Sequence, residues 1–432
     1  MLHGVDAMES WIVIKGARLF DGKNKLIENS VVVVSPDGLI YDVGTEGSVE
    51  LPKGVNIVEI YGKGHTVLPG LIDAHMHLSG LRTGDVVKEP LLTPYETLVA
   101  RCVRDLQSLI EAGFTTIVDA GSIIALGLKQ AVEENSVTGP RIVAAGLPLS
   151  QTFGHGDTHY LPLEYVDYRT SKLNDSIKSL ICDGVDECRK AARYALRMGS
   201  DFIKIFTTGG VMSQRDRPDY TQFTLEEIKA IVYEAEAAGK FVHAHAEGNK
   251  GIINALMGGV KVIAHADMID EDGIELALEK NAIIVPTLSV SEHIINYGKE
   301  LGLPSWAIEK ESELYRFHVD NVRRAYKRGV KIATGTDFWG GVKAFRHGDN
   351  ALEIALFVEK LGMTPVEAIK SATSVAAEAA GLKNTGIIEK GKLADLILVE
   401  GNPIDDVRTL MARDKVKLVI KNGKILKNTL TA

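Results

Sequence analysis

The sequence of 432 residues contains few cysteines, and this scarcity excludes two classes of protein. Only three cysteines are present, an odd number, and no two of them form the CxxC pair typical of structural zinc sites. A small domain held together by disulfides has a much higher density of cysteine. We therefore predict free thiols at Cys102, Cys182 and Cys188 and a reducing, cytoplasmic environment, although Cys182 and Cys188 could pair in an oxidising one.

Long apolar runs and an excess of positive charge are also missing. No stretch approaches the roughly 20 continuous apolar residues of a membrane span, and the N-terminus has neither the charged start nor the apolar core of a signal peptide. The net charge is −8, whereas nucleic-acid binding needs a clustered Lys/Arg surface. With 45% hydrophobic and 25% charged residues, the composition predicts a folded protein without a membrane or nucleic-acid partner.

Both ends of the chain are rich in short strands. Strand-like segments lie at 11–15, 31–34 and 39–43 near the start and at 396–399 and 415–420 near the end. The dipeptide Asn422-Gly423 is a strong signal for a hairpin turn. Because each end alone is too small for a core of its own, we expect residues 11–63 and 386–428 to form one small β-sandwich.

The middle of the chain alternates between apolar strands and amphipathic helices. We expect eight strands, at 66–77, 115–120, 141–147, 201–206, 240–246, 261–266, 282–288 and 331–337. One of the intervening helices, at 225–238, starts with a capping box of Thr224 and Glu227. This pattern predicts an α/β fold, a (β/α)8 TIM barrel over residues 64–385. A doubly wound open sheet is the alternative, but no GxGxxG follows the first strand.

One connection differs from the others in length. Residues 150–186 follow the third predicted strand as a long, polar, loop-like insertion. Long loops inside compact domains are usually functional, and the active sites of barrels are built from the loops that follow the strands. We expect this insertion to contribute to a functional site.

Polar side chains stand at the ends of several predicted strands. Residues i and i+2 of a strand point the same way, so His75 and His77 project to one side. A lone histidine in such a place is usually a core residue. Four further groups, however, occupy the ends of other strands: Lys204, His245, His265 and Asp337. Because such groups are rarely buried unless they are paired or bound to metal, six of them at one barrel mouth predict a functional site.

Imidazoles and a carboxylate suit zinc or a similar divalent ion, and a bound water then acquires a pKa near about 7. An ammonium at Lys204 would be repelled by such an ion. Reaction with CO2 would convert Lys204 into a carbamate, an anionic ligand that can bridge two metal ions; a salt bridge is the plainer alternative. His243 shares the inward side of its strand with His245 but lies one layer deeper, where we expect a supporting or core residue.

With these residues, the sequence resembles the amidohydrolase superfamily of metal-dependent hydrolases. The resemblance extends from Leu68-Pro-Gly-Leu-Ile-Asp-Ala-His-Met-His77 through Thr334-Gly-Thr-Asp337 to Gly391-Lys-Leu-Ala-Asp-Leu396. It implies that His75, His77 and Asp337 hold one ion, that His245 and His265 hold the second, and that carboxylated Lys204 bridges them. Zinc, manganese and cobalt all suit such a site. The resemblance also implies that the two chain ends pair and that the protein forms a homo-oligomer.

Three segments are similar to the imidazolonepropionase-related branch that includes prolidase-like dipeptidases. They are Phe153-Gly-His-Gly-Asp157, Ile203-Lys-Ile-Phe-Thr-Thr-Gly-Gly-Val211, and His347-Gly-Asp-Asn350 with the following Gly362-Met-Thr-Pro-Val-Glu-Ala368. This similarity implies that His155 polarises the scissile carbonyl, as expected of a donor aimed at a developing oxyanion. The alternative is a loop histidine that caps a turn.

The loop after the fourth strand contains candidate substrate contacts. Arg215, Arg217 and Tyr220 could hold a substrate carboxylate, since guanidinium groups make bidentate contacts with carboxylates. The neighbouring Asp216 and Asp219 equally favour solvated surface arginines. This segment also departs from the more apolar, proline-rich version expected in the branch.

The resemblance implies hydrolysis of an amide or peptide bond in a small molecule or dipeptide, by a dipeptidase of the prolidase (Xaa-Pro) type or by a carboxypeptidase-like activity on N-acyl amino acids. A hydroxide between two metal ions would attack the carbonyl, and Asp337 would pass its proton to the leaving nitrogen. One alternative is a mononuclear deaminase or cyclic-amide hydrolase, in which Glu247 would move protons; the presence of Lys204 argues against it. A non-catalytic scaffold protein is the other, and the six filled positions argue against that.

Overall fold

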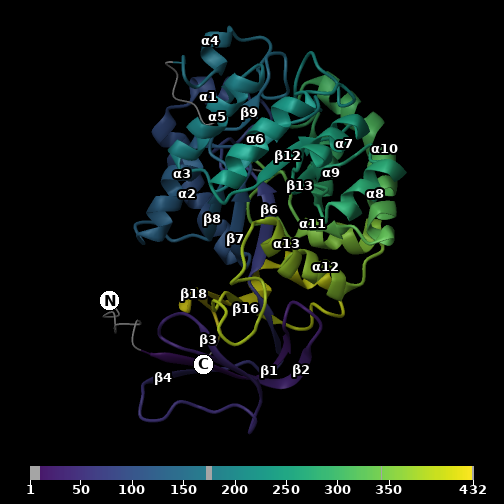
Figure 1. The fold of residues 1–432 in the computed structure, drawn as a ribbon. Helices are drawn as coiled ribbons and strands as arrows, with labels where there is room; N and C mark the ends of the chain where they lie inside the picture. Colours follow the sequence, from purple (N-terminus) through teal and green to yellow (C-terminus); the bar gives the residue numbers. More distant parts are fainter. Residues whose placement is uncertain (1–9, 172–177, 342, 431–432) are drawn as a thin grey trace.

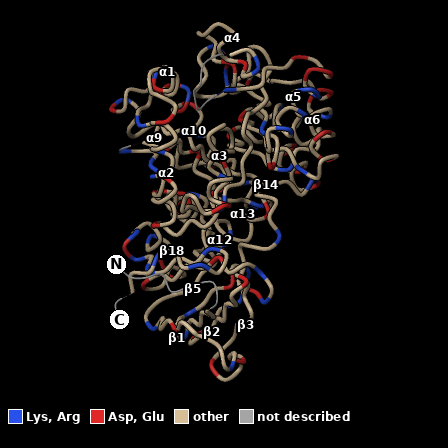
Figure 2. Tube along the Cα trace, turned by 90° about the vertical axis from the view of Figure 1, so that its left-hand side faces the viewer, with Lys and Arg blue, Asp and Glu red and all other residues tan. Residues whose placement is uncertain are grey.

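The structure is a computed structural model that describes residues 10–171, 178–341 and 343–430. Figure 1 shows a β-sheet at one end of the molecule and a barrel surrounded by helices above it. Within the described residues, no helix is both long and apolar enough to cross a membrane. Figure 2 shows that basic and acidic residues are intermixed along the chain.

The two ends of the chain build one sheet of eight strands. The strands from the first part are β1 (Trp11–Phe20), β2 (Leu26–Val34), β3 (Ile40–Thr45), β4 (Ile57–Tyr61) and β5 (His65–Pro69), and those from the last part are β16 (Leu396–Glu400), β17 (Val416–Lys421) and β18 (Lys424–Asn428). The two parts meet where β5 pairs antiparallel with β16. Asn422 and Gly423 both have positive φ, of 49° and 73°, in the turn between β17 and β18, which confirms the predicted hairpin.

This terminal sheet has its own hydrophobic core, to which both ends contribute. Ile12 and Ile14 of β1 pack in one cluster with Leu398 and Leu418, whereas Val13 of the same strand belongs to another cluster. Alternate residues of a strand point to opposite faces, so β1 is covered on both sides. The chain ends are therefore joined by side-chain packing as well as by strand pairing, as the sequence predicted.

The segment 66–77, expected to be one strand, is two strands. β5 ends at Pro69 and pairs in the terminal sheet, and β6 (Leu71–Met76) begins the barrel. Gly70 lies between them, where a Cβ atom would come within 2.0 Å of Thr115 Oγ1. Continuous apolar sequence on both sides of this close approach concealed the break.

The barrel consists of parallel strands in two hydrogen-bonded groups. One group is β6, β7 (Phe114–Asp119) and β8 (Arg141–Ala144), and the other includes β11 (Ile203–Phe206), β12 (Val242–Ala246), β13 (Val262–His265), β14 (Ile283–Val285) and β15 (Lys331–Ile332). Backbone hydrogen bonds of 2.8 Å join the groups on both sides, from Asp201 N to Ala144 O and from Ala74 N to Thr334 O. The eight-stranded, TIM-barrel type of fold is thereby confirmed.

Helices lie outside the barrel (Figure 1). They are α1 (Lys88–Leu92), α2 (Tyr95–Glu111), α3 (Ile123–Glu133), α4 (Leu163–Val166), α5 (Val185–Met198), α6 (Leu225–Ala237), α7 (Asn249–Gly258), α8 (Glu271–Glu279), α9 (Leu288–Tyr297), α10 (Ser305–Arg328), α11 (Leu352–Leu356), α12 (Pro365–Ser371) and α13 (Ser374–Ala379), with the shorter helical segments η1 (Phe357–Leu361), η2 (Val407–Met411) and η3 (Arg413–Lys415). The expected capping box of Thr224 and Glu227 opens α6.

The polar insertion after β8 lies at the end of the barrel opposite the terminal sheet. Its described residues form three short elements, β9 (Leu149–Ser150), α4 and β10 (Leu180–Ile181). In Figures 1 and 2, α4 is at the far end of the molecule from β1 and β2. Residues 172–177, which belong to the predicted insertion, lie outside the described part of the chain. The three cysteines are free, as predicted, and all three are buried.

Candidate metal centre and active site

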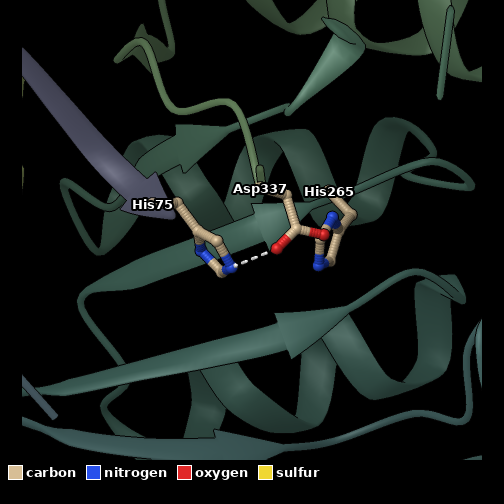
Figure 3. A group of neighbouring side chains, drawn as sticks. All are labelled: His75, His265 and Asp337. Carbon is tan, nitrogen blue, oxygen red and sulfur yellow. Dashed lines mark ion pairs between the residues drawn. The ribbon is translucent and has the colours of Figure 1, made fainter. Parts of the chain in front are cut away.

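The carboxyl ends of the barrel strands bring together side chains that are far apart in sequence. His75 lies on β6 and Asp337 follows β15, and their Nε2 and Oδ1 atoms are 3.3 Å apart (Figure 3). His77 Nε2 is 3.0 Å from the same oxygen. One ligand atom from each of His75, His265 and Asp337 lies within 4.8 Å of the others. Three strands thus supply one compact group of metal-ligating atoms.

Lys204 and His245 lie in the same group. Lys204 on β11 is 2% exposed, and its Nζ is 3.4 Å from His75 Nε2. His245 on β12 packs edge-on against His265, with ring centroids 4.6 Å apart. The structure therefore brings all six predicted metal ligands to one place.

Two of these residues have an unusual backbone conformation. His265 has φ 73° and Asp337 has φ 55°, in the left-handed region that residues other than glycine rarely adopt. Asp337 is held there by a hydrogen bond of 2.7 Å from its backbone N to the carbonyl of His75. Such conformations are about 1–3 kcal/mol less favourable and concentrate at functional sites.

A second contact orients each imidazole of the group. The outer nitrogens face the following partners: His243 Nε2 at 3.0 Å for His75, the Gly121 carbonyl at 3.4 Å for His77, the Gly209 carbonyl at 3.0 Å for His245 and Thr287 Oγ1 at 2.8 Å for His265. A partner on one ring nitrogen fixes the tautomer and directs the other nitrogen toward a metal ion. His243 is fully buried beside His75, which confirms its predicted place one layer deeper.

The donor set fits divalent metal ions. Four oriented imidazoles and a carboxylate are the ligands that zinc and related ions prefer. The amine of Lys204 is the exception, because an ammonium in this position would oppose a cation, whereas its carbamate would be an anionic ligand. The imidazoles and the carboxylate present are therefore suited to a metal centre.

The protonation states follow from burial and from the close contacts. Burial, with the charge of Lys204, lowers the pKa of His75 to about 3. Burial opposes ionisation of Asp337, but hydrogen bonds from His75 and His77 hold the pKa of Asp337 well below its usual value. Burial lowers the pKa of Lys204 to about 7. A neutral imidazole and an ionised carboxylate are the forms that bind metal.

A cavity opens beside this group, and its walls combine apolar and acidic side chains. Its lining includes His77, His245, His265 and Asp337 together with an apolar wall of Val86, Met212, Val290, Ile294 and Trp339. Such a mixture is typical of sites for small molecules, in which a few polar groups set the orientation of a mostly apolar ligand.

His155 also lines this cavity. Its ring stacks on that of His245, with centroids 4.2 Å apart and an interplanar angle of 12°. Burial lowers the pKa of His155 to about 4, while the charge of Asp216 opposes that shift. His155 is therefore placed next to the metal-ligating group, from the insertion that the sequence marked as functional.

The predicted substrate contacts after β11 lie elsewhere. The Arg217 side chain is 58% exposed and pairs with Asp219 at 3.1 Å. Tyr220 lines a neighbouring hollow, and the backbone N of Arg215 donates to His159 Nδ1 at 3.1 Å. Among the described residues, the lining of the main cavity includes none of these three. A role for them in binding a carboxylate stays a prediction.

Several residues near the site were not singled out from the sequence. Asp119 ends β7 and accepts a hydrogen bond of 2.6 Å from Leu78 N, and it carries the same signal as the other strand-end residues. Asp267 and Glu311 line the cavity with Glu247. Asp267 lies two residues after a predicted ligand, whereas no local pattern distinguishes Glu311 on the long helix α10.

Comparison with known proteins agrees with this geometry. Residues 66–426 match the amidohydrolase family. The ochratoxinase of Aspergillus niger is 34% identical over 96% of this chain and 86% of its own length, and its crystal structure superposes with a TM-score of 0.88 over 97% of this chain and 96% of that one. A prolidase complexed with N-methylphosphonate-L-proline is 33% identical, with a TM-score of 0.87 over 97% of this chain and 100% of that one.

A more distant relative aligns with this chain over a similar length. The imidazolonepropionase of Pyrobaculum arsenaticum is 24% identical over 92% of this chain and 93% of its own length. The family match covers most of the barrel and reaches into the terminal sheet. The chain therefore belongs to the amidohydrolase family and is a hydrolase.

Proposed function

We propose that this hydrolase uses two divalent metal ions to cleave the amide bond of a dipeptide of the Xaa-Pro type or of an N-acyl amino acid. The observation that carries the proposal is the convergence of six side chains from strands β6, β11, β12, β13 and the end of β15. Four of them, His77, His245, His265 and Asp337, line one cavity. In this assignment His75, His77 and Asp337 hold one ion, His245 and His265 hold the other, and carboxylated Lys204 bridges them.

The metal ions supply a nucleophilic water at neutral pH and polarise the carbonyl. Asp337 accepts the proton of the attacking water, since its Oδ1 is held ionised between His75 and His77. It then passes that proton to the leaving nitrogen, so that an amine rather than an amide anion departs. His155, which stacks on His245 and lines the cavity, contacts the substrate beside the reacting groups and orients it for attack.

The substrate class rests on the cavity and on the relatives. The apolar wall that includes Met212, Ile294 and Trp339 suits an apolar acyl or side-chain group next to the metal-ligating residues. Ochratoxinase and prolidases are among the most similar proteins. The presence of Lys204 beside His75 favours a two-metal site over the mononuclear alternative, in which a bridging lysine would have no role.

The test is a substrate screen with protein loaded with zinc, manganese or cobalt. We expect hydrolysis of dipeptides varied at the C-terminal residue, with Xaa-Pro and N-acyl amino acids among the best substrates, and two metal ions per chain by elemental analysis. Activity confined to lactones or aminopurines, or full activity with one ion per chain, would contradict the proposal. The Asp337→Asn variant provides the inactive control.

A further inference from the structure

A chain of hydrogen bonds leads from His155 away from the cavity. His155 Nδ1 is 2.8 Å from Ser213 Oγ, and the same hydroxyl contacts Asp216 Oδ1. Asp216 is 1% exposed, and Ser213, which also lines the cavity, is 7% exposed. This series of hydrogen bonds ends at the buried carboxylate of Asp216, on the loop after β11.

The direction of these hydrogen bonds is fixed by Gln222. Its Oε1 accepts from the backbone N of His155 at 2.8 Å, which turns its Nε2 toward Asp216 Oδ2 at 2.9 Å. An ionised carboxylate only accepts hydrogen bonds. Asp216 therefore accepts from Gln222 through one oxygen and from the Ser213 hydroxyl through the other.

This arrangement uses the single hydroxyl proton of Ser213 in its hydrogen bond to Asp216. The carbonyl of Gly210 lies 3.2 Å from Ser213 Oγ, farther than Asp216, and already accepts from Lys310 Nζ at 3.0 Å. Because the Ser213 hydroxyl donates its hydrogen bond to Asp216, Ser213 Oγ can only accept the hydrogen bond from His155 Nδ1. The ring of His155 thus carries a proton on Nδ1 and presents Nε2 to the cavity.

Lys310 of α10 holds the loop that contains Ser213 and Asp216 in place. Its Nζ donates to the carbonyls of Ser213 and Asp216, each at 2.7 Å, as well as to Gly210. It also lies 3.9 Å from Asp216 Oδ1, where its charge offsets that of the buried carboxylate. A long helix therefore fixes a short loop at the point where that loop meets His155.

We propose that Ser213 and Asp216 are positioning residues that fix neutral His155 as the Nδ1-protonated tautomer, so that its unprotonated Nε2 meets the substrate as a hydrogen-bond acceptor. The carbonyl donor that the sequence predicts at His155 would require the other tautomer. The assignment rests on the proposed function insofar as His155 contacts the substrate. The direction of these hydrogen bonds also predicts the effect of Asp216→Asn on the His155 tautomer. Because Gln222 Nε2 needs an acceptor, the Asn side chain places its Oδ1 toward Gln222 and its Nδ2 toward Ser213. Ser213 would then donate to His155 Nδ1, and the ring proton would move to Nε2.

The first test measures the tautomer directly by 15N NMR of ring-labelled histidine in the full-length protein, metal-free and zinc-loaded. A His155→Asn variant assigns the signals. We expect a protonated Nδ1 in the original protein and a protonated Nε2 in Asp216→Asn. Asp219→Asn, which changes an exposed carboxylate three residues away, should leave the Nδ1 tautomer in place. The same tautomer in the original protein and Asp216→Asn, or an unprotonated Nδ1 in the original, would overturn the proposal.

The second test is a double-mutant cycle with the substrate that the screen identifies. Ser213→Ala should lower kcat/KM by roughly 10–100-fold, the typical effect of losing a partner that orients a histidine, mainly through kcat. Ser213→Thr should restore most of the activity, since it keeps the hydroxyl. In a His155→Ala background, Ser213→Ala should have almost no further effect; losses that multiply would show that Ser213 acts independently of His155. If no amide substrate is found, the proposed function fails while the NMR result still decides the tautomer.

Discussion

His75 Nδ1 lies 3.0 Å from His243 Nε2, and the two rings meet from strands β6 and β12 on different sides of the barrel. The contact orients a proposed metal ligand through His243, which is not itself among the proposed ligands. Replacement of His243 by Leu should weaken metal binding by about 10–100-fold, because the Nδ1 of His75 loses its partner. Competition with a chelator measures the affinity.

A matched variant separates orientation from packing. The amide oxygen of Gln can reach nearly as far as Nε2 of histidine and likewise accept a hydrogen bond from His75 Nδ1, so His243→Gln should retain more of the metal affinity than His243→Leu. Equal affinity in all three proteins would show that the contact does not orient His75.

Asp337→Asn should lower kcat by at least about 100-fold, since the proton acceptor is lost. Asparagine tolerates positive φ better than most residues, so the backbone at φ 55° is expected to persist and the thermal unfolding midpoint to stay close to the original. Steady-state kinetics and calorimetry make the comparison. Retained turnover would remove Asp337 from the proton transfer.

Removal of metal by a chelator should abolish activity, and its recovery should depend on bicarbonate as well as on metal. Carboxylation of Lys204 requires CO2, and without it a buried amine 3.4 Å from His75 Nε2 does not bridge two cations. Recovery is measured by activity and by metal content, with Lys204→Met as the control that bicarbonate cannot rescue. Full recovery in CO2-free buffer would contradict a carboxylated lysine.

Asp395 should be important for stability rather than for chemistry. It is 3% exposed and accepts hydrogen bonds from Arg141 at 2.6 Å, Thr385 at 2.7 Å and the backbone N of Asn422 at 2.8 Å, which connect the barrel with the terminal sheet. Asp395→Ala should lower the free energy of unfolding by about 3–5 kcal/mol, because the partners lose a buried charge. Thermal unfolding measures the effect.

An exposed ion pair supplies the comparison for that experiment. Glu389 pairs with Lys23 while both side chains are more than half exposed, at 54% and 52%. Glu389→Ala should leave the unfolding midpoint nearly unchanged, since exposed pairs contribute little. A similar loss in both variants would mean that the buried position of Asp395 has no special weight.

The barrel and the terminal sheet were predictable because their signals are local. Apolar strands that alternate with capped helices are typical of a parallel barrel. The polar side chains at the strand ends indicate a functional site, because burial of an unpaired polar group is unfavourable; they are His75, His77, Lys204, His245 and Asp337. The break at Gly70 was not predictable, because it depends on how closely Thr115 of another strand approaches.

The supporting residues were harder to find for a related reason. Ser213 and Asp216 occur in a polar loop that looks like ordinary surface, and only the fold reveals that the carboxylate is buried against His155. Glu311 and Lys310 are charged positions of an amphipathic helix whose neighbours come from distant strands. Their roles depend on tertiary contacts, which a periodicity in one segment does not encode.

The pairing of β5 with β16 couples the candidate site to a strand that lies far from it in the sequence. β5 leads through Gly70 directly into the strand of His75, and Gly70 N is hydrogen-bonded to the carbonyl of Asp395 at 2.8 Å. The strand that leads into His75 is therefore held by a strand that lies far later in the sequence. A truncation that removes β16 would leave β5, and the turn at Gly70 that leads into β6, without that partner.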